Sequence, residues 1–329
     1  MEDISTEPPN ESAEVVQQRI IEKISTHEKA ILSLLDDPSK YNISSDASHH
    51  VKFLDTEEFT EALRPEVERA SYQGGEFKQD KFDSHIKSIE GKRTADGSIV
   101  VHNYTWEGGK WVLKTDNELQ EIADHEKTHG MLTPTFEPAG YYTRRKTGCK
   151  EVLLLEEKPV KVTGHDLYES QTQILTLYGA HPDVKSFKEL AAKNNPNYGS
   201  QLNLSTLCNL LDLTFHDFDG GVKFLASEYF SSDAKFMEKI LESTAAQYLG
   251  IEIPNELREK IISDSYNPDY IYNTIDFSRQ VTNLKNLLIP QNPMEELEST
   301  TSEILRKDEP PNKEDLNRLK ELTDKLRQM

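Results

Sequence analysis

The chain has 329 residues, with 38 Lys or Arg against 58 Asp or Glu, so its formal net charge at pH 7 is −20. This charge opposes non-specific binding to nucleic acid or to an anionic membrane, because both carry negative charge themselves. No apolar run approaches the roughly 18 residues of a membrane-spanning helix, so the sequence predicts no membrane insertion. Hydrophobic residues make up 35% of the chain, which favours a folded core with polar tails.

The cysteine content and the amino terminus bear on location. Cys149 and Cys208 are the two cysteines, so no disulfide framework is expected and a reducing compartment is favoured. The opening MEDISTEPPNES lacks the basic start and apolar stretch of a secretory signal. We therefore expect a cytoplasmic protein, or one delivered into a host cytosol by a route that needs no signal peptide.

The first part of the chain predicts a tail, two helices and a hairpin. Residues 1–12 are polar and acidic, which predicts a disordered tail. Apolar residues recur at helical spacing over residues 13–35, and a second helix is expected near 56–71. Residues 98–114 predict a β-hairpin that turns at a Gly-Gly pair, because glycine readily adopts the positive φ of tight turns.

A capped helix is predicted over residues 116–130. Thr115 and Glu118 have the spacing of a capping box, in which each side chain bonds the other's backbone N–H. Gly130 is expected to close the helix in a left-handed conformation. On a helical wheel one narrow stripe is apolar and consists of Leu119, Ile122, Ala123 and Gly130. The side expected to face solvent consists of Gln120, Glu121, Asp124 and Thr128.

The remaining chain predicts one more hairpin and then helices. The hairpin is expected over 141–155, and the pattern becomes helical after Pro159. Helices are expected near 165–178, 185–193, 203–215, 221–229, 233–248, 255–263 and 273–288. The Pro- and Glu-rich residues 291–313 predict a linker, and residues 314–329 an amphipathic carboxyl-terminal helix.

These elements together predict the α+β class. A small antiparallel sheet with helices is expected over residues 13–160. An all-α helical domain is expected over residues 161–290.

The predicted helix 116–130 carries the sequence His-Glu-Lys-Thr-His at residues 125–129. Positions i and i+4 share one face of a helix, so His125 and His129 can direct their imidazoles at one metal ion. Glu126 lies within the apolar stripe, where a carboxylate is costly unless it is paired or lies near a metal. Beside a zinc ion it can take a proton from water that attacks a peptide carbonyl. Only roughly 0.03 chance matches to this pattern are expected in such a chain.

At these residues the chain resembles the zincin metallopeptidase superfamily. The resemblance implies Zn²⁺ held by His125 and His129, with Glu126 as general base. It also implies a strand that borders the cleft ahead of the motif helix, for which hairpin 98–114 is the candidate. Lys127 departs from the family, where the residue after the Glu is usually apolar. The longer metal-binding pattern of the astacin-like branch is absent.

Catalytic zinc usually has three protein ligands, so a third one is needed. In the gluzincin branch the third ligand is a Glu from a later helix, and Glu169 is the residue favoured by that resemblance. His165, four residues earlier on the same helix face, is the alternative. Tyr141 and Tyr142 are candidates for stabilising the oxyanion, by proximity in sequence alone.

Two other functions compete with this reading. Cys149 and His165 could form a nucleophile and its base, although Cys149 is not expected at the helix N-terminus that would activate it. The segment Phe224-Leu-Ala-Ser-Glu-Tyr-Phe-Ser and the spacing over 251–261 resemble RGS domains, helical modules that bind G-protein α subunits.

The sequence therefore predicts a zinc-dependent endopeptidase that acts on a protein substrate. Its Glu-rich carboxyl tail also fits an effector exported by a specialised bacterial secretion system. The alternative is a non-catalytic, acidic helical module that binds another protein.

Overall fold

A computed structural model describes most of the chain. The described residues are 13–41, 43–44, 51–71, 78–94, 98–155, 158–194, 201–231, 235–248, 252–266, 270–288, 297, 301, 304, 312, 315–320 and 323. The predicted tail 1–12 and most of the predicted linker 291–313 lie outside these residues. Of the predicted carboxyl-terminal helix, residues 315–320 and 323 are described and are helical.

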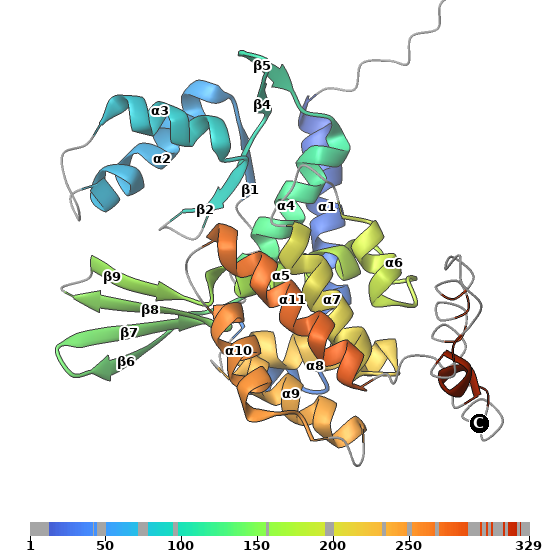
Figure 1. Cartoon of the computed structure of the whole chain (residues 1–329). Helices are drawn as coiled ribbons and strands as arrows, with labels where there is room; N and C mark the ends of the chain where they lie inside the picture. The colour runs from blue at the N-terminus through green and yellow to red at the C-terminus, as the bar shows by residue number, and fades with distance from the viewer. Residues whose placement is uncertain are drawn as a thin grey trace, which may run out of the picture.

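The α+β class is confirmed, but the strands in the described part of the chain form three separate sheets. The first sheet has the order β1-β3-β2 and is mixed, because β1 runs parallel to β3 while β2 runs antiparallel to it. Its strands are β1 (Val51–Leu54), β2 (Gly91–Arg93) and β3 (Ile99–His102). Helices α2 (Thr56–Ser71) and α3 (Gln79–Ser88) lie beside it, and α2 has the bounds expected from the sequence (Figure 1).

Strand β3 separates two parts of the core, because successive side chains of a strand point to opposite faces. Val100 packs with the buried side chains of α2 and α3. Ile99 and Val101 pack on the other face, against α1 (Ala13–Leu32) and α4 (Asp116–Gly130). The small sheet thereby holds α4 in place between itself and the rest of the molecule.

The predicted hairpin 98–114 is only half correct. Strands β4 (Tyr104–Glu107) and β5 (Lys110–Leu113) do form a hairpin, and the turn has Gly108 at φ +57° and Gly109 at +86°. The first arm, however, ends at Asn103, whose backbone N–H donates to Leu54. The residues before it form β3 in the other sheet, because Leu54 and its neighbours on β1 pair with them.

A four-stranded antiparallel meander projects from the centre of the molecule (Figure 1). Its strands are β6 (Thr135–Ala139), β7 (Tyr142–Thr147), β8 (Lys150–Leu155) and β9 (Lys158–Thr163). The β7–β8 pair confirms the predicted hairpin 141–155. The expected change to helix after Pro159 was wrong by a few residues, since β9 continues to Thr163 and pairs with β8.

Every helix expected between residues 165 and 288 is found, with ends shifted by at most a few residues. They are α5 (His165–Ala180), α6 (Phe187–Ala192), α7 (Gln201–Thr214), α8 (Phe218–Ser231), α9 (Phe236–Gln247), α10 (Asn255–Tyr266) and α11 (Tyr270–Leu288). Helix α5 is central and contacts α1, α4, α7 and α8 (Figure 1). Among the described residues no helix has the length and apolarity to cross a membrane.

Helices α1 and α5 approach closely at Gly179. A Cβ atom on this glycine would overlap the buried ring of His27 on α1. Burial lowers the pKa of His27 to about 3, with Lys127 adding to the effect, so the ring is neutral at pH 7.

We expect Gly179→Ala to destabilise the fold by about 1–3 kcal/mol. The collision forces the two helices apart, which outweighs the helix propensity of up to about 1 kcal/mol that alanine adds. Urea unfolding measures the change. Gly220→Ala is the control, because its Cβ meets only the Asp217 carboxylate at 3.1 Å. An unchanged midpoint for Gly179→Ala would contradict the close packing.

Candidate metal site

Helix α4 presents the motif, and its start agrees with the sequence prediction. Thr115 Oγ1 accepts a hydrogen bond from the backbone of Glu118, whose carboxylate accepts from the backbone of Thr115 at 2.7 Å. The expected ending was wrong. Gly130 is the last helical residue, and Met131 follows in a right-handed conformation with φ −70°.

The expected solvent side of α4 was also partly wrong. Asp124 and Thr128 are buried, although both were expected to face solvent. The reason is tertiary, because α1 and α5 both pack against α4 and leave it little exposed surface. Burial raises the pKa of Asp124 to about 7, although Gln120 donates to its carboxylate at 2.9 Å.

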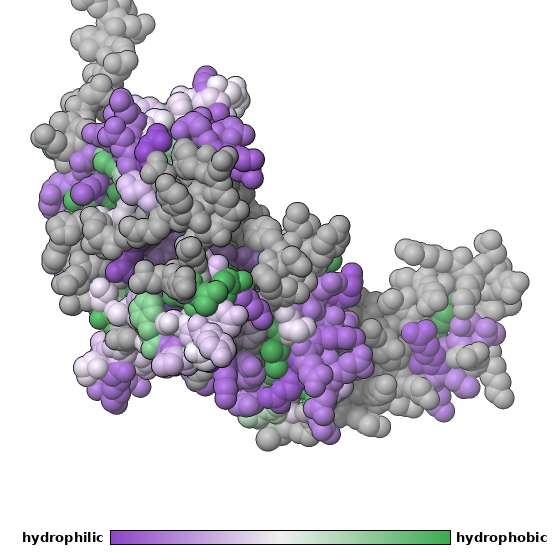
Figure 2. Space-filling model, turned by 90° about the vertical axis from the view of Figure 1, so that its left-hand side faces the viewer, coloured by the Kyte–Doolittle hydropathy of each residue, from purple (hydrophilic) through white to green (hydrophobic). Residues whose placement is uncertain are grey.

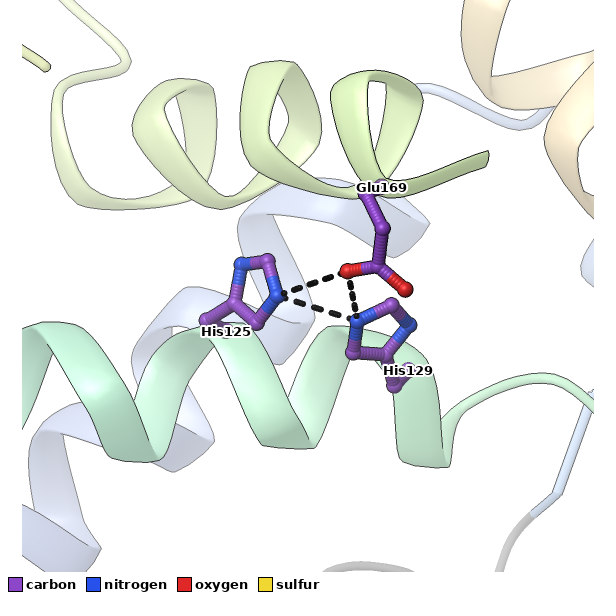
Figure 3. Close-up of side chains that lie close together, drawn as sticks. All are labelled: His125, His129 and Glu169. Atoms are coloured by element: carbon purple, nitrogen blue, oxygen red, sulfur yellow. Dashed lines mark hydrogen bonds and ion pairs between the residues drawn. The ribbon is translucent and has the colours of Figure 1, made fainter. Parts of the chain in front are cut away.

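The two histidines of α4 meet Glu169 of α5, as Figure 3 shows. His125 Nε2 and His129 Nε2 are 2.9 Å apart. Glu169 Oε2 lies 3.0 Å from His129 Nε2 and 3.4 Å from His125 Nε2. Three ligand atoms of the kinds that bind zinc therefore converge on one point.

Residues of α5 fix the orientation of both imidazoles. Gln173 Oε1 lies 2.7 Å from His125 Nδ1 and accepts its proton, while Gln173 Nε2 donates to Asn194 at 2.8 Å. Thr172 Oγ1 lies 3.3 Å from His129 Nδ1, and its hydroxyl donates to the Tyr168 carbonyl at 2.9 Å. Each imidazole thus forms a hydrogen bond through Nδ1 and turns Nε2 toward the cluster. Residues that are not ligands themselves orient metal-binding histidines in this way.

The three ligand atoms fit a tetrahedral zinc ion. Bonds of 2.0–2.1 Å place the ligand atoms of such an ion about 3.3 Å apart, and the separations here are 2.9, 3.0 and 3.4 Å. With both Nδ1 atoms protonated, the neutral rings offer only acceptor lone pairs toward the carboxylate. A proton or a metal cation must therefore lie among them.

The close approach of these groups shifts the pKa values of His129 and Glu169. Burial opposes charge on His129, but the adjacent Glu169 carboxylate overcomes this and raises the pKa of His129 above its ordinary value. Burial likewise opposes the Glu169 anion, yet the two histidines hold its pKa well below the usual range. The site is therefore built to keep Glu169 as an anion, the form that binds a metal ion.

A cavity of about 660 Å³ opens beside the cluster and is lined by His125, Glu126 and Glu169. Figure 2 shows the molecule hollowed, with hydrophilic surface in the recess. One wall is the segment from α3 to β2, and the other is the first half of α5. The structure therefore places Glu126 in the cavity beside two of the three candidate ligands.

Strand β2 borders the cavity, whereas hairpin 98–114 was the expected candidate. Strand β2 packs so closely on α4 that a Cβ on Gly91 would lie 3.0 Å from Cγ of Glu126. It lies at the edge of its sheet and, in the described part of the chain, pairs with β3 alone.

The other sequence candidates lie outside the triad. His165 Nδ1 is 3.4 Å from Glu169 Oε1, on the opposite oxygen from the one facing the α4 histidines. Tyr141 and Tyr142 lie at the β6–β7 turn with 95% and 41% of their surface exposed, and neither lines the cavity. Cys149 is buried, which raises the pKa of its thiol, so the thiolate needed for nucleophilic catalysis is disfavoured.

Sequence reasoning missed the residues that orient the imidazoles. Gln173 follows Glu169 by four positions and Thr172 by three, so both lie on the face of α5 that carries Glu169. The spacing of Thr172 and Gln173 from Glu169 was the signal that the sequence offered. It could identify them as partners of the imidazoles only once the antiparallel packing of α5 on α4 was known.

Comparison of the chain with models of known protein families, with curated proteins and with solved structures finds no match.

Proposed function

We propose that this protein is a zinc-dependent hydrolase that cleaves peptide bonds. The observation that carries the proposal is the convergence of His125 Nε2, His129 Nε2 and Glu169 Oε2 beside a cavity that Glu126 lines together with His125 and Glu169. A bound Zn²⁺ would acidify a water molecule and polarise a carbonyl group.

The chain's own residues supply the remaining requirements. Glu126 takes the proton from the attacking water and can return it to the departing amine. Gln173 and Thr172 hold the two imidazoles with Nε2 toward Glu169, so the ligands need not reorganise. The three candidate ligands and the two residues that orient the imidazoles lie on α4 and α5. These two helices pack against each other, which holds the geometry rigid.

Strand β2 supports an extended peptide as the substrate. Its outer edge can offer backbone N–H and C=O groups to a chain added as a further strand. Ile89, Glu90, Gly91 and Lys92 line the cavity along this wall. A peptide bound there would pass Glu126, because β2 packs against α4 at that residue.

Metal analysis of purified protein tests the proposal first. We expect about one zinc per chain after incubation with zinc and gel filtration. The variant with His125→Ala and His129→Ala should retain almost none. Glu169→Gln should weaken zinc binding at least about a hundredfold, since loss of an outer-shell partner alone weakens it about 10- to 100-fold.

His165→Ala is the matched control and should bind zinc like the parent chain. Loss of zinc in this variant would make His165 a ligand in place of Glu169. Absence of zinc from the parent protein would overturn the hydrolase proposal and leave the non-catalytic binding module as the better explanation.

A further inference from the structure

Helix α8 carries a buried tyrosine that contacts both helices of the metal site. Tyr229 has none of its surface exposed, and it lies in the segment 224–231, to which the proposed hydrolase gives no role. Its hydroxyl donates to the backbone carbonyl of Thr128 on α4 at 3.3 Å and lies 3.0 Å from Thr172 Oγ1 on α5. One hydroxyl group therefore joins the two helices that supply the candidate ligands.

Two backbone carbonyls fix the directions of these hydrogen bonds, because a carbonyl oxygen can only accept. The single hydroxyl proton of Tyr229 goes to the Thr128 carbonyl. The hydroxyl proton of Thr172 has two acceptors other than His129, namely the Tyr168 carbonyl at 2.9 Å and the Tyr229 oxygen at 3.0 Å. Thr172 Oγ1 therefore offers a lone pair to His129 Nδ1, 3.3 Å away. His129 donates through Nδ1, which leaves Nε2 without a proton and able to bind a metal ion.

The aromatic rings near His129 pack in the same region. The ring centre of Tyr168 lies 4.9 Å from that of His129, and the Tyr229 ring stacks on Tyr168 at 5.6 Å with an interplanar angle of 5°. Phenylalanine in place of Tyr229 keeps this stacking and removes only the hydroxyl group. The contribution of the hydrogen bonds can therefore be measured without a change in the packing of the rings.

We propose that Tyr229 is a positioning residue of the metal site, and that it acts through Thr172 to hold His129 with Nε2 toward Glu169. This inference rests on the zinc site of the proposed function. Tyr229 contacts none of the three ligand atoms itself. Its effect is to fix the position and proton direction of Thr172, so that α8 contributes to metal affinity although the candidate ligands lie on α4 and α5.

The zinc affinity of Tyr229→Phe, measured by competition with a chelator, tests the inference. We expect zinc to bind about fivefold more weakly, the change that corresponds to loss of one ordinary hydrogen bond. Thr172→Val, which removes Oγ1, should weaken binding about 10- to 100-fold. Adding Tyr229→Phe to Thr172→Val should have no further effect, because the residue through which Tyr229 acts is then gone. Thr172→Ser keeps Oγ1 and should bind zinc like the parent chain.

Tyr41→Phe is the matched control. The hydroxyl of Tyr41 lies 3.0 Å from Ser227 Oγ, which is also on α8, and this bond involves neither Thr172 nor an imidazole. The variant therefore loses the same kind of hydrogen bond to the same helix. Its midpoint in urea can fall as much as that of Tyr229→Phe, but its zinc affinity should equal that of the parent chain. An equal loss of zinc affinity in both variants would overturn the inference.

Exchange of the His129 Nδ1 proton with solvent, measured by NMR, separates failure of this inference from failure of the proposed function. The measurement is made with and without zinc. We expect exchange about fivefold faster in Tyr229→Phe than in the parent chain, and no change in Tyr41→Phe.

Faster exchange in Tyr229→Phe, with no zinc bound by the parent chain, would overturn the zinc site and retain the positioning role of Tyr229. Zinc binding by the parent chain, with affinity and exchange unchanged in Tyr229→Phe, would retain the zinc site and overturn the positioning role. A full effect of Tyr229→Phe in the presence of Thr172→Val would also overturn the inference, since Tyr229 would then act by another route.

Discussion

The variant Glu126→Gln should keep its zinc and lose about a thousandfold in peptide cleavage rate. Glutamine has nearly the same shape as glutamate but cannot accept the proton of the attacking water, and general-base catalysis contributes about 10²–10⁴-fold. Glu126 lines the cavity with His125 and Glu169 but is not one of the three converging groups. Cleavage of a random decapeptide library by the zinc-loaded protein measures the rate, and elemental analysis measures the zinc.

The control for this variant is Glu121→Gln, an exposed position of the same helix. It should leave both rate and zinc content unchanged. Full cleavage activity in Glu126→Gln would remove Glu126 from the mechanism. Loss of zinc together with activity would make Glu126 a ligand, contrary to the assignment of Glu169.

The variant Glu28→Gln should lose about 3–5 kcal/mol of unfolding free energy. The side chain of Lys127 is completely buried, and its Nζ lies 3.2 Å from Glu28 Oε2 on α1. Burial lowers the pKa of Lys127, and the Glu28 carboxylate opposes that shift. Without the carboxylate a buried ammonium group loses its counter-charge, which is the costly case.

Replacing the cation instead should cost much less. Lys127→Met keeps most of the volume and removes the completely buried charge. The Glu28 carboxylate left behind belongs to a side chain that is 16% exposed and can be hydrated, so we expect a loss of less than about 2 kcal/mol. Urea denaturation of the three proteins makes the comparison. Glu256→Gln, which breaks an exposed pair with Lys260 on α10, is the control and should not shift the midpoint. Equal losses in Glu28→Gln and Lys127→Met would contradict the proposed asymmetry.

The pair also accounts for the residue that departs from the zincin pattern. In zincins the residue after the motif Glu is usually apolar, and the helical wheel of residues 116–130 does not by itself explain a lysine at position 127. Lys127 is buried like an apolar residue, but its charged end meets a carboxylate of a helix about a hundred residues earlier in the chain. The departure is thus a matter of packing between α1 and α4.

The sequence alone determined the local structure of the motif. The capping box places the start of α4 at Asp116, and the i, i+4 rule then puts His125 and His129 on one face whatever surrounds the helix. The helical half was also predictable, because each of its helices has a regular apolar spacing and is bounded by Gly, Pro or Asn. The third candidate ligand, Glu169, came from the family resemblance, and the structure brings it to the two histidines.

Only the tertiary structure decided how these parts meet. The antiparallel contact of α4 with α5 brings Gln173 and Thr172 to the imidazoles. Packing of α1 and α5 against α4 buries Asp124 and Thr128, on the side that the sequence pattern predicted to face solvent. Strand pairing between segments 48 residues apart turned residues 99–102 into β3 and left β2 at the edge of the cavity. The physical reason is that periodicity records which side of an element is apolar, whereas contacts between distant segments depend on loop lengths, shape and charge across the whole molecule.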